Sequence, residues 1–140
     1  MNDIVTYSLL IDDDKATNFF NKRMLLKHKA FKDVKVIQEA KNALEYLKNI
    51  NNQLHKKPEL IFLDINMPFM NGWDFLEEFA NLEKDVIDDI KIIMLSTSND
   101  PNDIKKALKN ELVYDFINKP LSNDVINQVI GKHFSYKIAR

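Results

Sequence analysis

The chain has 140 residues, 45% of them hydrophobic and 29% charged, a balance that fits one globular domain and excludes a disordered chain. Its formal net charge of -1 argues against a strongly basic nucleic-acid surface, and the lack of cysteine excludes disulfides and thiolate metal sites. No apolar run approaches the ~20 residues of a membrane-spanning helix, and the first residues lack the pattern of a secretion signal. We expect a single domain over residues 1–140, with no second domain, in the cytoplasm.

The first half of the chain alternates short apolar runs, typical of buried strands, with stretches of helical spacing. The predicted strands are Tyr7–Ile11, Val34–Ile37 and Leu60–Leu63. The first helix is predicted to turn inward Ala16, Phe19, Phe20 and Met24, and the second, running on towards Asn51, to turn inward Ala40, Leu44 and Leu47. Because the third strand is continuously apolar, we expect helices on both faces of the sheet.

The second half of the chain continues this alternation. The predicted strands are Ile92–Leu95 and Val113–Ile117. The predicted helices carry Trp73, Leu76, Phe79 and Ala80, then Ile104, Ala107 and Leu108, then Ile126, Val129 and Ile130. Three places have residues typical of helix starts: Asp14, the segment Asn99-Asp100-Pro101, and Ser122. Five strands alternating with five helices predict an α/β fold with a parallel sheet and right-handed crossovers.

Polar side chains that carry chemistry follow four of the five predicted strands. Asp12 and Asp13 follow the first strand, Asp64 the third, Ser96 the fourth and Lys119 the fifth. In an open parallel sheet, ligands bind at the carboxyl ends of the strands. A flavodoxin-like (βα)5 three-layer sandwich with strand order 2-1-3-4-5 would bring these groups to one edge.

The charges of this cluster suggest its chemistry. Carboxylates crowded together repel one another and need protonation or a cation, and Mg²⁺ suits a site built from oxygen ligands. A carboxylate can also attack phosphorus and form an aspartyl phosphate. Such a transfer needs positioning and charge neutralisation, which Mg²⁺ and the Lys119 ammonium could supply, while the Ser96 hydroxyl could bind a phosphoryl oxygen.

Several segments together resemble the receiver domain of two-component response regulators. They are Leu10-Ile11-Asp12-Asp13-Asp14, Phe62-Leu63-Asp64-Ile65-Asn66-Met67-Pro68, Asn71-Gly72, Ile93-Met94-Leu95-Ser96 and Phe116-Ile117-Asn118-Lys119-Pro120-Leu121. The resemblance covers nearly the whole chain in the family's order and spacing. It implies a single-domain, chemotaxis-regulator-like receiver of a histidine–aspartate phosphorelay, with no output domain and no enzymatic activity beyond its own phosphorylation and dephosphorylation.

The resemblance also implies a role for each site residue. Asp64 is the phosphoacceptor, and the Mg²⁺ ligands are the side chains of Asp13 and Asp64, the backbone carbonyl of Asn66, and Asp12 directly or through water. Ser96 and Lys119 complete the catalytic set.

The resemblance also implies a surface, around the fifth strand, that changes on phosphorylation and binds a partner. Ser96 moves towards the phosphoryl group and Phe116 turns inward, which alters the face made by the predicted helix after Pro101, the strand Val113–Ile117 and the last helix. The expected partners are a histidine kinase or phosphotransfer protein, a downstream target, and a second copy on activation, with no nucleic acid and no membrane. The Lys119-Pro120 bond is expected to be cis, and Gly72 to meet a backbone need, either positive φ or a close approach.

Two other functions remain open. Paired aspartates at a strand end also occur in Mg²⁺-dependent phosphatases of the haloacid dehalogenase type, but Ala16 stands where their hydroxyl residue is expected. A degenerate receiver that acts only as an interaction module is the other alternative, and the presence of every expected catalytic group counts against it.

Overall fold

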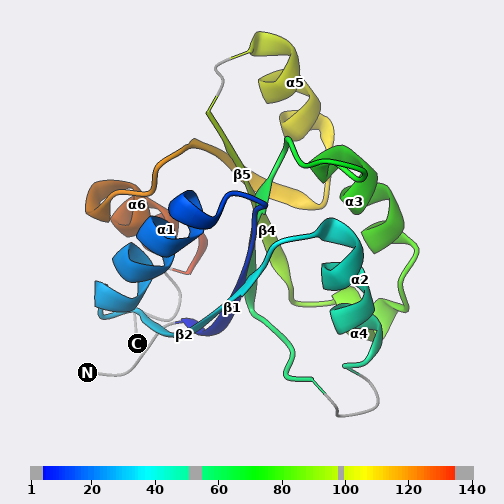
Figure 1. Ribbon diagram of the computed structural model, residues 1–140, viewed down its shortest axis with the longest axis horizontal. Helices are drawn as coiled ribbons and strands as arrows, with labels where there is room; N and C mark the ends of the chain where they lie inside the picture. The colour runs from blue at the N-terminus through cyan, green and yellow to red at the C-terminus, as the bar shows by residue number, and fades with distance from the viewer. Residues whose placement is uncertain (1–4, 51–54, 98–99, 135–140) are drawn as a thin grey trace.

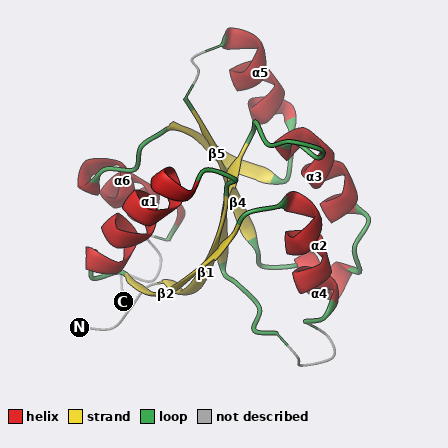
Figure 2. Ribbon diagram, viewed as in Figure 1, coloured by secondary structure: helices red, strands yellow, loops and turns green. Residues whose placement is uncertain are grey.

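The structure, a computed structural model, describes residues 5–50, 55–97 and 100–134, in which strands and helices alternate (Figures 1 and 2). The strands are β1 (Val5–Ile11), β2 (Phe31–Ile37), β3 (Leu60–Asp64), β4 (Lys91–Ser96) and β5 (Val113–Asn118). The helices are α1 (Lys15–Lys27), α2 (Ala40–Lys48), α3 (Gly72–Ala80), α4 (Lys84–Ile87), α5 (Pro101–Lys109) and α6 (Asn123–His133). Within the described part of the chain, no helix is long and apolar enough to cross a membrane.

The sheet has five parallel strands in the order β2-β1-β3-β4-β5, as the sequence predicts. β1 and β3 lie side by side in the middle, and β4 follows β3. Because all strands run in the same direction, their carboxyl ends reach one edge of the sheet. The connection from β2 to β3 passes over β1, so the strand order changes direction between β1 and β3. In open parallel sheets, ligands bind at the carboxyl edge beside such a point.

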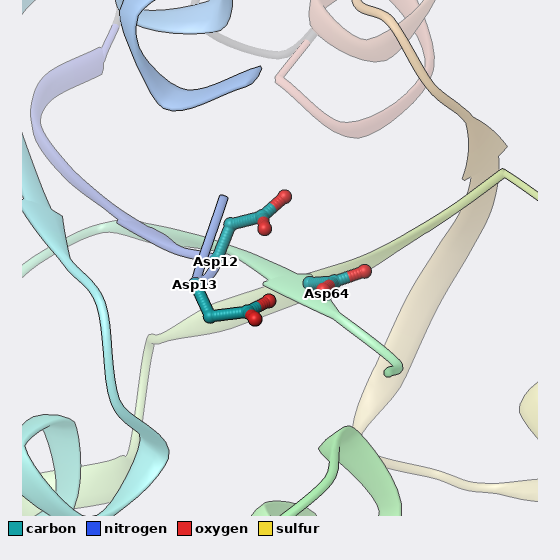
Figure 3. A group of neighbouring side chains, drawn as sticks. All are labelled: Asp12, Asp13 and Asp64. Carbon is teal, nitrogen blue, oxygen red and sulfur yellow. The ribbon is translucent and has the colours of Figure 1, made fainter. Parts of the chain in front are cut away.

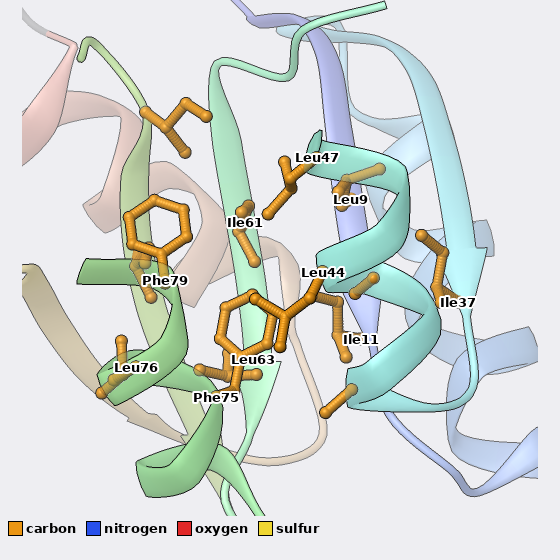
Figure 4. Packing of buried hydrophobic residues seen from close by; sticks show 14 of the residues in the cluster. Leu9, Ile11, Ile37, Leu44, Leu47, Ile61, Leu63, Phe75, Leu76 and Phe79 are labelled. Carbon is orange, nitrogen blue, oxygen red and sulfur yellow. The ribbon is translucent and has the colours of Figure 1, made fainter. Parts of the chain in front are cut away.

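Helices cover both faces of the sheet. Figure 1 shows α1 and α6 on one side, and α2, α3, α4 and α5 on the other. Alternate residues of each strand enter the two layers: in β1, Leu9 and Ile11 pack under α2 and α3, and Leu10 packs under α1 and α6. Figure 4 shows the first of these layers, where Leu44 of α2 and Phe75 of α3 close over Ile61 and Leu63 of β3. This burial on both faces explains the continuous apolar character of the third strand.

The structure corrects the predicted inner face of the first helix. Phe19 and Phe20 are 67% and 45% exposed, and the buried residues of α1 are Asn18, Asn21 and Leu25. Hydrophobic spacing alone gives the wrong phase, because two asparagines occupy inward positions where apolar residues are expected.

Smaller differences concern helix number and boundaries. α4 makes a sixth helix, and its four residues are too few to show helical spacing in the sequence. The second helix ends at Lys48, whereas Asn51 lies outside the described residues, as does Asn99 of the predicted cap before Pro101. Asp14, Asp100 and Ser122 do cap their helices, each side chain accepting hydrogen bonds from backbone N–H groups of the first turn.

Candidate functional site

Three carboxylates meet at the carboxyl edge of the sheet. Asp12 and Asp13 directly follow β1, and Asp64 is the last residue of β3 (Figure 3). One oxygen of each lies within 4.8 Å of the others. Asp12 and Asp64 are buried and Asp13 is exposed, so the cluster opens to solvent on one side. An all-oxygen donor set with one or two carboxylates is what Mg²⁺ accepts in proteins.

Lys119 joins the carboxylates from the neighbouring side. Its Nζ donates hydrogen bonds to Asp12 Oδ2 at 2.9 Å and to Asp64 Oδ1 at 3.0 Å, with all three side chains nearly buried. The lysine follows β5, where its backbone N–H donates to the Ser96 carbonyl at 2.7 Å and extends the β4–β5 pairing by one residue. The next peptide bond, Lys119-Pro120, is cis, as the resemblance implies.

The electrostatics of the cluster reflect its burial. Removal from water, followed by the nearby charge of Asp12, raises the pKa of Asp64 to about 6, although the bond from Lys119 opposes this change. Burial alone would lower the pKa of Lys119, but its hydrogen bonds to Asp12 and Asp64 outweigh that effect and raise it. The lysine is therefore charged, and both carboxylates accept hydrogen bonds from its ammonium.

The turn from β1 into α1 fixes the direction of Asp12. Its backbone N–H donates to the Ile37 carbonyl at 3.2 Å, and its Oδ1 accepts the N–H of Asp14 at 3.0 Å. Asp14 then caps α1, and this capping lowers the pKa of its exposed carboxyl through the backbone N–H of Thr17. The carboxylate of Asp12 is thus held by the turn on one oxygen and by Lys119 on the other.

Two residues of α1 that the sequence analysis did not identify bind the backbone next to this site. Asn18 Nδ2 donates to the Asp12 carbonyl at 2.7 Å, and Asn21 Oδ1 accepts the Leu121 N–H at 3.1 Å. The signal that could have revealed them is their place, three residues apart, on the inward face of a helix beside the acidic turn.

The loop after Asp64 is shaped by a close backbone approach. A Cβ on Gly72 would lie 2.7 Å from the Asp64 carbonyl oxygen and 3.0 Å from the Ile65 Cα, and the Gly72 N–H donates to the Ile65 carbonyl at 2.7 Å. Gly72 does not have a positive φ, so close approach is the need that this glycine meets. Asn66 lies exposed in this loop, and Phe69 there is fully exposed with a φ of 69°.

Ser96 and Phe116 lie on the neighbouring strands β4 and β5. Ser96 is fully buried at the end of β4, whereas Phe116 is half-buried and packs against the hydrophobic layer that contains α3. Asp115 accepts the Phe116 N–H on Oδ1 at 2.9 Å, and its Oδ2 lies 3.0 Å from His133 Nε2 of α6. Phe116 is therefore connected through its neighbour to the last helix.

A comparison with known protein families decides the classification. The profile of the response regulator receiver domain matches residues 9–131, nearly the whole chain. The chain belongs to this family. Among its relatives, the chemotaxis protein CheY of Listeria monocytogenes is 32% identical over 124 residues, which are 89% of this chain and 95% of that protein. The probable C4-dicarboxylate response regulator DctR of Bacillus subtilis is 31% identical over 129 residues, which are 92% of this chain but 52% of DctR.

Solved receiver structures share the fold. A two-component response regulator from Cytophaga hutchinsonii superimposes with a TM-score of 0.83 at 29% identity, covering 91% of this chain and 96% of that one. A response regulator receiver protein from Dyadobacter fermentans gives a TM-score of 0.79 at 26% identity, with 91% and 96% covered. The chain thus spans nearly all of some relatives and about half of DctR.

In this receiver, the structure brings together most of the residues singled out in the sequence. Asp12, Asp13, Asp64 and Lys119 form one cluster, and Ser96 ends the strand beside Asp64. Phe116 lies apart from the cluster, on β5, and Asn66 lies in the loop beyond it.

Proposed function

We propose that this receiver is a phosphorylation switch in which Asp64 accepts a phosphoryl group from a phosphohistidine donor. The observation that carries the proposal is the pairing of a buried Asp64 with the Lys119 ammonium at 3.0 Å, beside two further carboxylates. A lysine held in this place neutralises negative charge that builds up during phosphoryl transfer. Membership of the receiver family supports the same chemistry.

The transfer itself requires one free carboxylate oxygen. Lys119 binds Asp64 Oδ1, so in this proposal Oδ2 is the nucleophile. Oδ2 forms a bond to phosphorus while the bond from phosphorus to the donor's imidazole nitrogen breaks, and the imidazole leaves with the electron pair. The Ser96 hydroxyl, at the end of β4, would bind a phosphoryl oxygen. In this proposal the chain catalyses its own phosphorylation and dephosphorylation only.

The acidic cluster fits a divalent cation. Asp12, Asp13 and Asp64, together with the Asn66 backbone carbonyl, would hold Mg²⁺, which supplies positive charge next to the phosphoryl oxygens. The donor set consists of oxygens alone, and one side of it is exposed through Asp13, which leaves room for water and phosphoryl oxygen ligands. Sites with these properties favour Mg²⁺ over zinc.

A largely apolar depression next to the cluster supports approach of the donor. It is lined by Ala16, Thr17, Phe20, Thr97, Lys119 and Pro120. Phe20, which the sequence predicted to face inward, is exposed and contributes apolar surface here. We infer that a histidine kinase or phosphotransfer protein of the cytoplasm presents its phosphohistidine through this depression. The signal then passes to a target, or to a second copy, through the face formed by α5, β5 and α6.

Phosphorylation by acetyl phosphate with Mg²⁺ tests the proposal. Intact mass measurement should show one added phosphoryl group on the wild type and none on Asp64→Asn. Asp85→Asn is a matched control, because Asp85 is an exposed aspartate of α4, which precedes β4 and so lies away from the carboxyl edge. Equal modification of Asp64→Asn would assign the acceptor elsewhere.

The same preparation separates the alternative functions. Steady turnover of p-nitrophenyl phosphate would favour a phosphatase of the haloacid dehalogenase type. No modification of the folded wild type by acetyl phosphate or by phosphohistidine donors would favour a degenerate receiver that only binds partners.

A further inference from the structure

Helix α1 turns two asparagines into the protein interior. Asn18 is 3% exposed and Asn21 is fully buried, and both point to the side of the sheet where Leu10 and Leu25 pack. They lie three residues apart, so their side chains occupy the same face of the helix. Burial of an amide is unfavourable unless its hydrogen bonds are replaced within the protein.

Each asparagine uses one of its two polar side-chain atoms to bind the backbone next to a site residue. Asn18 Nδ2 donates to the carbonyl of Asp12, at the point where β1 ends and the acidic turn begins. Asn21 Oδ1 accepts the N–H of Leu121, two residues after Lys119 in the segment that joins β5 to α6. One helix therefore holds both the acidic side and the basic side of the cluster.

The other half of each amide is not satisfied. Asn18 Oδ1 and Asn21 Nδ2 are buried atoms for which the described residues offer no hydrogen-bond partner. A buried polar atom without a partner costs stability; leucine at either place would remove that cost but would leave the Asp12 carbonyl or the Leu121 N–H without its hydrogen bond. What each amide provides at its position is therefore the bond to the backbone next to a site residue.

We propose that Asn18 and Asn21 are positioning residues for phosphoryl transfer. Asn18 sets the turn that carries Asp12 and Asp13, and Asn21 sets the segment that carries Lys119. This inference rests on the proposed function of Asp64, and it adds that α1 aligns the two halves of the site separately.

Substitution of Asn18 and substitution of Asn21 should have different kinetic effects, because each residue positions a different half of the site. Asn18→Leu should raise the Mg²⁺ concentration needed for half-maximal phosphorylation by ~10-fold, because misplacing a group behind metal ligands commonly costs 10–100-fold in metal affinity or activity. Asn21→Leu should leave that concentration nearly unchanged and lower the rate at saturating Mg²⁺ by ~10-fold, because the lysine is displaced and the carboxylates are not. A merely structural role would not separate the two parameters.

Three further variants serve as controls. Ser8→Ala removes another buried oxygen without a partner from β1, on the same face as Leu10, and should change neither parameter. Asn21→Asp keeps an acceptor for the Leu121 N–H and should recover most of the rate, whereas Asn21→Ala should not. Asn18→Ala replaces Asn18→Leu if the larger side chain prevents folding. Near-UV circular dichroism and thermal melting establish that each protein is folded.

The outcomes distinguish this inference from the proposed function. If the folded wild type takes no phosphoryl group from acetyl phosphate or from a phosphohistidine donor, the proposed function fails. If the wild type is phosphorylated and both leucine variants match it, the positioning roles are wrong. Equal losses of both parameters in both variants, or failure of both the leucine and alanine variants to fold, would also overturn the proposal by making the asparagines purely structural.

Discussion

The Lys119 ammonium lies between the carboxylates of Asp12 and Asp64. Because all three side chains are nearly buried, removal of the ammonium should lower the stability of the fold. The side chains of Lys119, Asp12 and Asp64 are 9%, 0% and 5% exposed. Lys119→Met leaves both carboxylates without their cation, and breaking a buried ion pair from one side costs about 3–5 kcal/mol. The free energy of unfolding should fall by about that amount when Mg²⁺ is removed by a chelator, as measured by urea denaturation at neutral pH.

Magnesium should compensate for part of this loss. Because Lys119 and the proposed cation would bind the same carboxylates, Mg²⁺ should stabilise Lys119→Met more than it stabilises the wild type. Lys48→Met is the control, since Lys48 lies 3.9 Å from Glu45 in an exposed pair that contributes about 0–1 kcal/mol. An equal response of wild type and Lys119→Met to Mg²⁺ would show that the lysine and the cation do not share ligands.

Asp64 makes stability depend on pH. Its pKa is raised to about 6 by burial and then by Asp12, whereas an unfolded aspartate titrates near 4 (~3.9). The folded state therefore holds the proton more tightly, and the stabilisation from that proton is fully present below about pH 4 and lost as the pH rises through about 6.

Asp64→Asn should consequently be more stable than the wild type at about pH 7.5 without Mg²⁺. A shift of about two pKa units corresponds to a gain of roughly 2–3 kcal/mol, and this value already includes the opposing bond from Lys119. Urea denaturation at about pH 4 and about pH 7.5 checks this, because the gain should disappear at the lower pH. A gain independent of pH would mean that the charge on Asp64 is not its source.

At the residue level, the sequence predicted the charged groups of the site better than their supports. Asp12, Asp13, Asp64 and Lys119 follow strands directly, so alternation of strands and helices is enough to bring them to one edge. Asn18 and Asn21 occupy positions where helical spacing expects apolar residues, and the partner of Asn21 is a backbone group 100 residues along the chain.

The start of α3 depends on a single glycine. A Cβ on residue 72 would contact backbone atoms of Asp64 and Ile65 at 2.7 and 3.0 Å, and backbone cannot move aside as a flexible side chain can. Gly72→Ala should lower the free energy of unfolding by about 1–3 kcal/mol, the usual cost of overpacking. It should also slow phosphorylation, because the displaced strand end carries Asp64.

The second glycine of the chain provides the matched control. Gly131 lies near the end of α6, and a Cβ there would have no atom within 4 Å. Gly131→Ala should therefore raise stability, by at most about 0.5–1 kcal/mol, because alanine favours the helix. Thermal or urea denaturation of both variants checks the pair, and equal effects would contradict the close approach at Gly72.

At the level of elements, the sequence located every strand but not every helix face. The apolar runs of β1, β3 and β4 are buried on both sides, so their signal is strong, and the observed strands extend the predicted ones by a few residues. α1 was assigned the wrong face because Phe19 and Phe20 lie outside while amides lie inside. α4 was missed because a four-residue helix has no repeating face.

The whole molecule connects the site to a distant surface through the order of its strands. β4 and β5 are neighbours at one side of the sheet, and Met94 of β4 pairs with Phe116 of β5. Ser96, at the end of β4, is buried near the acidic cluster, and Phe116 is only half-buried. Movement of Ser96 towards a phosphoryl group would therefore change the space that the Phe116 ring can occupy.

Asp115 extends this connection to α6. It accepts the Phe116 N–H, and its other oxygen lies 3.0 Å from His133 and 3.5 Å from the Lys132 ammonium. Burial would raise the pKa of Asp115, but the bond to His133, the Phe116 N–H and the charge of Lys132 together lower it. The carboxylate is therefore charged at neutral pH and pairs with the Lys132 ammonium on the last helix.

We expect phosphorylation to shift an existing equilibrium between two conformations of this face. Addition of Mg²⁺ and beryllofluoride, a mimic of the phosphoryl group, should change NMR shifts and amide exchange in α5, β5 and α6 as well as around Asp64. Phe116→Ala should leave phosphorylation of Asp64 nearly intact and weaken the changes in α6, because the ring that links the strands is missing. Phe79→Ala, which removes a buried ring of α3, should lower stability without selectively removing the α6 response. Changes that stay around Asp64, or that concentrate on α1 and α2, would place the output surface elsewhere.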